Sequence, residues 1–180
     1  MPENWDMRPL AAPRRAGPDT DFAAVLALIQ RCFAYMDGRI DPPSSMHRLT
    51  VEAVRAQADE GEVWLIDGPE GPDGAPVACV FLTPRADCLY LGKLAADPAF
   101  RGRGLARALV ECAMDRAAAL GLPAVELQAR VELVENHRAF AAMGFAKTGE
   151  TAHAGYDRPT SITMRRPVAG PGQTGPGVSP

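Results

Sequence analysis

Residues 91–109 of the 180-residue chain read LGKLAADPAFRGRGLARAL. The apolar residues at the start of this stretch predict a buried strand over about 88–95, which Asp97-Pro98 stops. The apolar spacing after Gly104 predicts a long helix over 104–120, which Gly121 ends. A strand, a short basic loop and a helix therefore follow one another directly.

The loop between this strand and this helix has the features of an anion-binding site. The first turn of a helix leaves about four backbone N–H groups unpaired and carries a partial positive charge. Gly102 and Gly104 lack the Cβ atom that would keep a phosphate from the backbone, and Arg101, Arg103 and Arg107 add positive charge. The Walker A pattern is absent because no Gly-Lys-Ser/Thr follows. The dinucleotide-binding fingerprint fails because Arg107 stands where its third glycine should be.

Further strands and helices are expected along the rest of the chain. Further strands are expected over about 7–12, 63–66, 77–82, 124–128, from 145 onward and 161–165. Further helices are expected over about 20–35, 50–58 and 132–143. This order indicates a mixed α/β (α+β) domain built around one central sheet.

Glycine and proline mark the borders of the expected domain. Residues 167–180 read PVAGPGQTGPGVSP, with no periodicity and no charge. Such a segment buries too little apolar surface to offset the entropy of ordering it, so we expect a disordered tail. Residues 1–6 are expected to be an N-terminal extension, and residues 7–166 the domain itself.

Composition argues against several classes of protein. A length of 180 residues suits one domain, and no apolar run reaches the roughly 18 residues that a membrane span needs. The N-terminus lacks the apolar stretch of a secretory signal, and a net charge of −3 argues against a nucleic-acid partner. The cysteines at 32, 79, 88 and 112 have no Cys-x-x-Cys spacing and only three histidines to help. We therefore expect no metal site, and free thiols in a reducing cytoplasm.

The sequence Arg-x-x-Gly-x-Ala at 101–106, after an apolar-Ala-Asp-Pro turn, resembles the acetyl-CoA-binding motif of the GNAT superfamily of N-acetyltransferases. Asn136 and the Met-Gly-Phe at 143–145 extend the resemblance downstream, and it covers about residues 7–166. It implies the GNAT fold, in which a mixed, mostly antiparallel sheet is splayed between its fourth and fifth strands, with helices on both faces.

The resemblance also implies the residues that hold acetyl-CoA, the expected co-substrate. Backbone groups of Leu94, Ala95 and Ala96 would pair with the pantetheine arm as an added strand would, and Asn136 would contact the cofactor from the next helix. The pyrophosphate would be held by the junction, namely Arg101, Gly102, Arg103, Gly104, Leu105 and Ala106.

The catalytic groups depart from the family's pattern at two positions. The tyrosine that often protonates the departing thiolate should lie four residues before Gly144, where this chain has Phe140. Tyr156 is a candidate substitute from the last hairpin, or an ordinary surface or core tyrosine. Lys93 stands on the central strand where a glutamate is often seen. Glu126 on the next strand is the candidate replacement, although a glutamate on the solvent face of a strand is equally ordinary.

The resemblance implies that the first two helices wall the acceptor site, and the loop over 37–48 joins these helices. Arg39, Ser44 and Arg48 in this loop could bind an acidic or phosphorylated acceptor, and His153 in the late segment could join them. The alternative is a plain turn in which Ser44 or Ser45 caps a helix.

Three functions follow from these patterns. The first is transfer of an acetyl group from acetyl-CoA directly to a primary amine of a small molecule or peptide. The second is a non-catalytic acyl-CoA-binding or sensing module, and the third is an unrelated phosphate-binding domain. Neither nucleic acid nor a membrane is expected as a partner, and assembly into a homodimer stays open.

Overall fold

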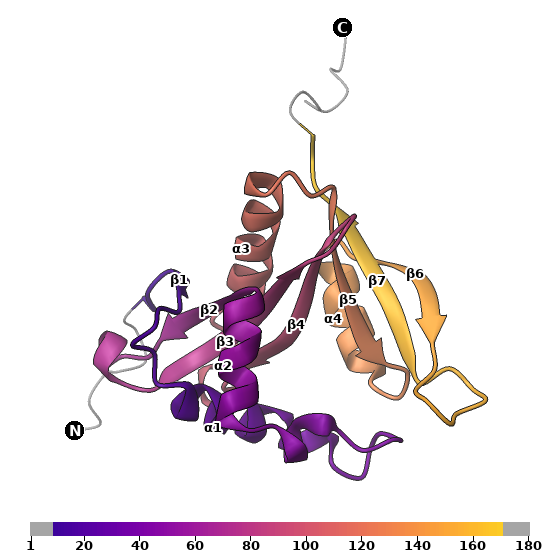
Figure 1. Cartoon of the computed structure of the whole chain (residues 1–180), viewed down its shortest axis with the longest axis horizontal. Helices are drawn as coiled ribbons and strands as arrows, with labels where there is room; N and C mark the ends of the chain where they lie inside the picture. Colours follow the sequence, from indigo (N-terminus) through magenta and orange to yellow (C-terminus); the bar gives the residue numbers. More distant parts are fainter. Residues whose placement is uncertain (1–8, 171–180) are drawn as a thin grey trace, which may run out of the picture.

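The computed structural model describes residues 9–170 and forms one seven-stranded sheet with helices on both of its faces (Figure 1). The strands are β1 (Arg14–Arg15), β2 (Glu62–Asp67), β3 (Pro76–Pro84), β4 (Leu89–Ala96), β5 (Ala124–Arg130), β6 (Ala146–Thr151) and β7 (Ser161–Pro167). The α-helices are α1 (Phe22–Phe33), α2 (Val51–Glu60), α3 (Leu105–Ala119) and α4 (Val134–Ala142). Short 3₁₀ helices are η2 (Ala34–Met36), η3 (Ser45–Arg48), η4 (Gly71–Asp73) and η5 (Pro98–Phe100).

The strand order across the sheet is β1-β2-β3-β4-β5-β7-β6. Every neighbouring pair is antiparallel except β4 and β5, which run parallel because helix α3 returns the chain between them. The predicted mixed, mostly antiparallel sheet is thereby confirmed.

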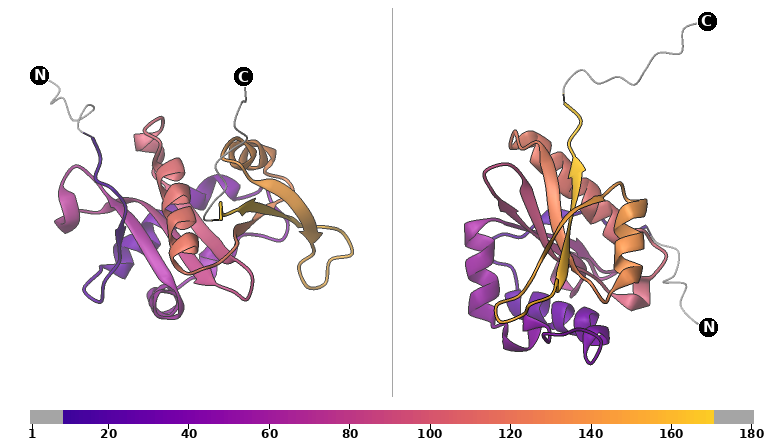
Figure 2. Two further views of the ribbon diagram at one scale, coloured as in Figure 1. Left: turned by 90° about the horizontal axis from the view of Figure 1, so that it is seen from above. Right: turned by 90° about the vertical axis from the view of Figure 1, so that its right-hand side faces the viewer.

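Two hydrophobic cores lie on opposite faces of the sheet (Figure 2). Side chains alternate between the two faces of a strand, so β2, β3 and β4 each contribute to both cores. On β2, Ile66 packs in the core beneath α3, whereas Leu65 packs beneath α1. Helices α3 and α4 cover one face, and α1 and α2 cover the other.

Side-chain caps set the start of α1 and α2. The Asp21 side chain accepts hydrogen bonds from two backbone N–H groups at the start of α1, and Thr50 accepts one from Ala53 at the start of α2. Helix α3 differs, because its N-cap is Gly104 in the left-handed conformation, with no side-chain cap. The first turn of α3 therefore keeps backbone donors for another partner.

The first strand lies later than the sequence predicted. We expected a strand over 7–12, but residues 9–12 form none and residues 7 and 8 lie outside the described residues. The strand forms at Arg14–Arg15 instead, where a two-bond contact of Arg14 with the buried Asp67 carboxylate, at 2.7 and 2.9 Å, holds it against β2. Pro13 lacks a backbone N–H and so cannot extend the ladder as a donor.

The two expected terminal segments fall largely outside the described residues, which exclude 1–8 and 171–180. At the C-terminal border, β7 includes Pro167, and the Val168 N–H donates to the Pro123 carbonyl at 2.8 Å. No helix within residues 9–170 combines the length and the apolar character needed to cross a membrane.

Candidate active site

The site begins where β4 and β5 part. These strands pair only at Leu89–Val125 and Tyr90–Glu126 among the described residues, and beyond Tyr90 and Glu126 they diverge (Figure 1). The splay between the fourth and fifth strands is therefore present. Backbone groups on the facing edges of both strands are left without a strand partner, which makes the gap a place where an extended ligand could pair.

A bulge in β4 explains the divergence. Strand β3 has one residue between Cys79 and Phe81, whereas the paired stretch of β4 has two residues between Gly92 and Ala95. Strand β4 therefore has one extra residue at this point, which forms a bulge. Within the bulge, Lys93 has a left-handed conformation, with φ of +46°. A bulge of this kind bends its strand, so that β4 turns away from β5 at the centre of the sheet.

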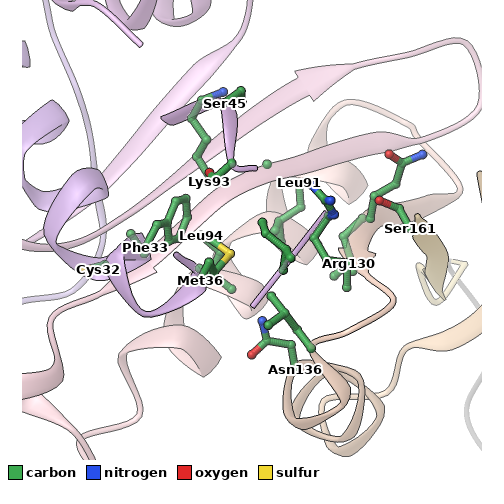
Figure 3. Close-up of a pocket in the computed structure, with 18 of the residues that line it drawn as sticks. Cys32, Phe33, Met36, Ser45, Leu91, Lys93, Leu94, Arg130, Asn136 and Ser161 are labelled. Atoms are coloured by element: carbon green, nitrogen blue, oxygen red, sulfur yellow. The ribbon is translucent and has the colours of Figure 1, made fainter. Parts of the chain in front are cut away.

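A cavity of about 540 Å³ lies in the gap between β4 and β5 (Figure 3). Its volume falls within the range usual for small-molecule sites. The lining comes from residues 90–96 of β4 and 127–130 of β5, several residues between 32 and 48, Leu133, Asn136, Phe140, His153 and Ser161.

The charged side chains that line the cavity are positive. Arg48, Lys93 and Arg130 line it, and neither Asp nor Glu is among its lining residues in the described chain. The Lys93 ammonium donates to the Gln57 side-chain oxygen at 2.5 Å, and burial lowers the pKa of Lys93. The Arg130 guanidinium donates to the Pro42 carbonyl at 2.6 Å.

The junction before α3 is open to a ligand. Gly102 and Gly104 have φ of +80° and +72°, and a Cβ added at either would have no heavy atom within 4 Å. The first intrahelical bond runs from Ala108 N–H to the Gly104 carbonyl, which leaves the preceding amides of α3 without a helical acceptor. Arg101 and Arg107 are exposed here, and the Arg103 guanidinium lies 5.6 Å from the centre of the Phe100 ring. Open backbone donors and arginines together fit a pyrophosphate.

A sequence model of the Acetyltransferase (GNAT) family matches residues 22–145, which include the junction and the parted strands. The chain belongs to the GNAT acetyltransferase family. The members of this family are acyltransferases, and the coenzyme whose acetyl group they transfer is acetyl-CoA.

One relative of this GNAT domain is mycothiol acetyltransferase of Beutenbergia cavernae, with 32% identity over 149 residues. The match covers 79% of this chain but 46% of that protein, so the chain spans about half the length of this relative.

Two solved structures share the fold. An acetyltransferase from Streptococcus agalactiae matches with a TM-score of 0.68 at 16% identity, covering 89% of this chain and 99% of that one. A chain of the NatC complex bound to Gag peptide and CoA matches with a TM-score of 0.65 at 18% identity, covering 90% and 100%. At these identities the likeness concerns the fold alone.

Of the ten residues predicted for acetyl-CoA, four line the cavity in the gap of this GNAT fold, and the six junction residues do not. Leu94, Ala95 and Ala96 line the cavity on the bent end of β4. Asn136 lines it from α4, and its side-chain nitrogen donates to the Tyr35 hydroxyl at 3.0 Å. The junction residues 101–106 form the loop and first turn of α3 described above.

The two predicted catalytic residues do not line the cavity. Glu126 lies at the closed end of the gap, with its carboxylate 3.1 Å from Arg165 and 3.8 Å from Arg85. The Tyr156 hydroxyl donates to Asp41 at 2.7 Å, and this hydrogen bond raises the pKa of Tyr156. Both remain predictions, and in this structure both side chains are engaged elsewhere.

The predicted acceptor residues fall into two groups. Ser44, Arg48 and His153 line the cavity, whereas Arg39 does not and is paired with Glu135 at 2.5 Å. Ser44 also caps η3 by accepting from Met46 N–H at 3.3 Å, as the alternative interpretation predicted.

Polar contacts of Asp41 join three loops beside the cavity. The Asp41 carboxylate accepts hydrogen bonds from Tyr156 at 2.7 Å and from Arg158 at 2.9 Å, which joins the α1–α2 loop to the β6–β7 loop. The Asp41 N–H donates to Glu132 at 3.2 Å, just after β5. Three loops that are distant in sequence therefore meet beside the cavity.

Sequence reasoning missed Tyr35, Cys32 and Arg130, all of which line the cavity. Arg130 could have been found, because it continues the alternation of Glu126 and Gln128 along one face of β5. Tyr35 and Cys32 could not, since only the docking of α1 and η2 beside the gap brings them there.

Proposed function

We propose that this GNAT domain transfers an acetyl group from acetyl-CoA directly to a primary amine of a small molecule or peptide. The observation that carries the proposal is the bent β4, which opens the sheet into a cavity lined by its end at Ala95 and Ala96, and from which the chain runs through a short loop to the uncapped start of α3. An extended thioester arm and its pyrophosphate need such an arrangement, with a strand edge for the arm and backbone N–H donors for the phosphates.

Bound acetyl-CoA would supply an activated acyl group, and the chain's own residues position it. The unpaired backbone edge of residues 91–96 can align the pantetheine amides, and Asn136 approaches from the opposite wall. Backbone N–H groups on this edge can also stabilise the negative charge that develops on the acyl oxygen.

The acceptor amine must lose a proton before it attacks. A lysine-like amine has a pKa of about 10.4, and no carboxylate lines the cavity in the described chain to serve as a base. Arg48, Lys93 and Arg130 offer a different route, since nearby positive charge disfavours an ammonium and lowers its pKa. The proton can then leave to water.

Tyr35 is the phenol that can protonate the departing thiolate. It lines the cavity with Phe140, the residue at the family's usual tyrosine position, which cannot donate a proton. Because the Tyr35 oxygen accepts from Asn136, the hydroxyl proton is left for another acceptor. A thiol has a pKa near 8.5, so this proton transfer assists departure without being indispensable to it.

The cofactor site is tested by replacing Gly104 with Asp or Asn. Both residues accept the left-handed conformation better than most, and the space around Gly104 accommodates either. We expect Gly104→Asp to weaken acetyl-CoA binding about tenfold or more relative to Gly104→Asn, because only the former places a negative charge beside the pyrophosphate. Calorimetry gives both affinities, and circular dichroism checks the fold. Equal affinities would contradict the site.

An assay for release of the CoA thiol distinguishes a transferase from a protein that only binds acetyl-CoA. The non-catalytic module remains the second candidate because Phe140 replaces the expected tyrosine. A thiol assay across a panel of primary amines decides between them. If acetyl-CoA binds and no amine raises thiol release above background hydrolysis, the transferase proposal fails.

The proposed setting of the enzyme is the cytoplasm. All four cysteines are free thiols, as suits a reducing compartment. The homodimer remains a proposal to be tested by light scattering.

A further inference from the structure

We propose that the acceptor amine carries an anionic group, a carboxylate or a phosphate, which Arg48, Lys93 and Arg130 bind on the α1–α2 face of the sheet. This inference rests on the proposed transferase function and names the class of its substrate.

The first support is that these three cations lack acidic partners. None of Arg48, Lys93 and Arg130 forms an ion pair within residues 9–170. Elsewhere the fold pairs its arginines readily, as Arg14 with Asp67 and Arg116 with Glu62 show. The cavity therefore gathers positive charge that the protein itself does not neutralise.

The second support is an unmet hydrogen bond. Arg130 uses one terminal nitrogen for the Pro42 carbonyl, but its Nε atom is buried and has no acceptor. A buried charged donor without a partner costs free energy, so such groups normally have one. An anion entering the cavity beside Arg130 would provide it (Figure 3).

The third support is that these cations lie on the other face of the sheet from the pyrophosphate junction. On β5, Leu127 and Ala129 pack in the core beneath α3, so Gln128 and Arg130 point to the opposite face. Lys93 reaches Gln57 of α2, which covers that same opposite face.

Arg48 belongs to this second face as well. It ends η3, whose Met46 is buried in the core beneath α1 and α2. The phosphates of acetyl-CoA have their own basic loop at the start of α3, on the first face. The second set of cations therefore points to the other substrate.

The acceptor class follows from this geometry. A guanidinium binds a carboxylate or phosphate with charge-assisted, directional hydrogen bonds, and two arginines with a lysine offer several donors from separate elements. An amine with no anionic group would leave these donors unsatisfied. A cationic acceptor, such as a polyamine, would in addition be repelled.

The test compares matched acceptors in the thiol-release assay. β-Alanine is paired with β-alaninamide for the carboxylate, and O-phosphoethanolamine with ethanolamine for the phosphate. We expect kcat/KM to be about tenfold or more higher for at least one anionic member than for its neutral partner. The pair of acceptors that shows the higher kcat/KM for its anionic member identifies the anion as a carboxylate or a phosphate.

Variants then assign the preference to the cations. Arg130→Gln and Arg48→Gln should each reduce the anionic-to-neutral ratio of kcat/KM about tenfold, and Arg48 is exposed, so its replacement spares the fold. Arg138→Gln is the matched control, because Arg138 is exposed on α4 and does not line the cavity. It should leave the ratio unchanged.

Two outcomes overturn the inference while the proposed function stands. One is turnover of the neutral amines with kcat/KM equal to or above that of their anionic partners. The other is an anionic preference that survives both Arg130→Gln and Arg48→Gln. Failure of the proposed function looks different, since acetyl-CoA would then bind while no amine of either kind raised thiol release.

Discussion

The Asn136 side chain on α4 donates a hydrogen bond of 3.0 Å to the Tyr35 hydroxyl on η2, and both residues line the cavity. The two residues lie 101 positions apart in sequence, yet this contact joins the wall beside α1 to the wall formed by α4. It also fixes the role of the tyrosine oxygen as an acceptor from Asn136 and leaves its proton available.

Replacing Tyr35 with Phe should lower kcat about tenfold, a modest effect for a general acid because a thiolate leaves tolerably well without one. The loss should be largest below pH 8.5 and shrink above it, since the thiolate needs no proton once the pH exceeds the thiol pKa of about 8.5. The pH profile of kcat measures this, and a purely structural defect would lower kcat equally at every pH.

Tyr156→Phe is the control for this experiment. It removes a phenol that donates to Asp41 and does not line the cavity. We expect its kcat to stay near that of the unaltered protein. The opposite pattern, with Tyr156→Phe impaired and Tyr35→Phe active, would return the role of acid to Tyr156.

Transfer should be direct, without an acetylated cysteine. Cys32 lines the cavity, but burial raises the pKa of its thiol to about 11. At pH 7 only about one thiol in ten thousand would be the nucleophilic thiolate. Cys32→Ala should therefore keep kcat within about threefold, the margin that a small packing change allows. Intact mass spectrometry after incubation with acetyl-CoA should show no added acetyl group, and acetylation at Cys32 together with an inactive Cys32→Ala would contradict direct transfer.

Acid stability should depend on Glu62. Its buried carboxylate accepts two bonds from Arg116, at 2.7 and 2.9 Å, and one from Trp64 at 2.8 Å. The hydrogen bonds from Arg116 chiefly hold the pKa of Glu62 below its usual value of 4.5. The stability that this carboxylate contributes is therefore complete above pH 4.5 and is lost as the pH falls through its lowered pKa.

Glu62→Gln should cost about 2 kcal/mol of unfolding free energy at pH 7, because it removes charge-assisted hydrogen bonds from a buried group. The difference from the unaltered protein should narrow in acid, and urea unfolding at pH 7 and at about pH 3 measures both values. Glu111→Gln is the control, since Glu111 is half exposed and pairs with Arg166 at the surface. It should change stability by less than about 0.5 kcal/mol.

Local sequence was sufficient for the strand, loop and helix of residues 88–120, because turn glycines and apolar spacing act over a few residues. It misplaced the first strand, since β1 exists only through pairing of Arg14 with Leu65, far along the chain. The same limit explains the site. Gly102 and Gly104 could be recognised in place, whereas Tyr35 meets Asn136, and Arg130 meets Pro42, only through the tertiary fold.

Because β4 and β5 diverge, each has an unpaired backbone edge in the middle of the sheet, in addition to the two edges at its outer strands. An exposed strand edge invites pairing with another chain and so promotes aggregation. Here residues of α1, η2 and α4 line the same cavity as these edges and so flank them on both sides. The bulge at Lys93 thus lets the protein keep unpaired backbone for its ligand while shielding it from other chains.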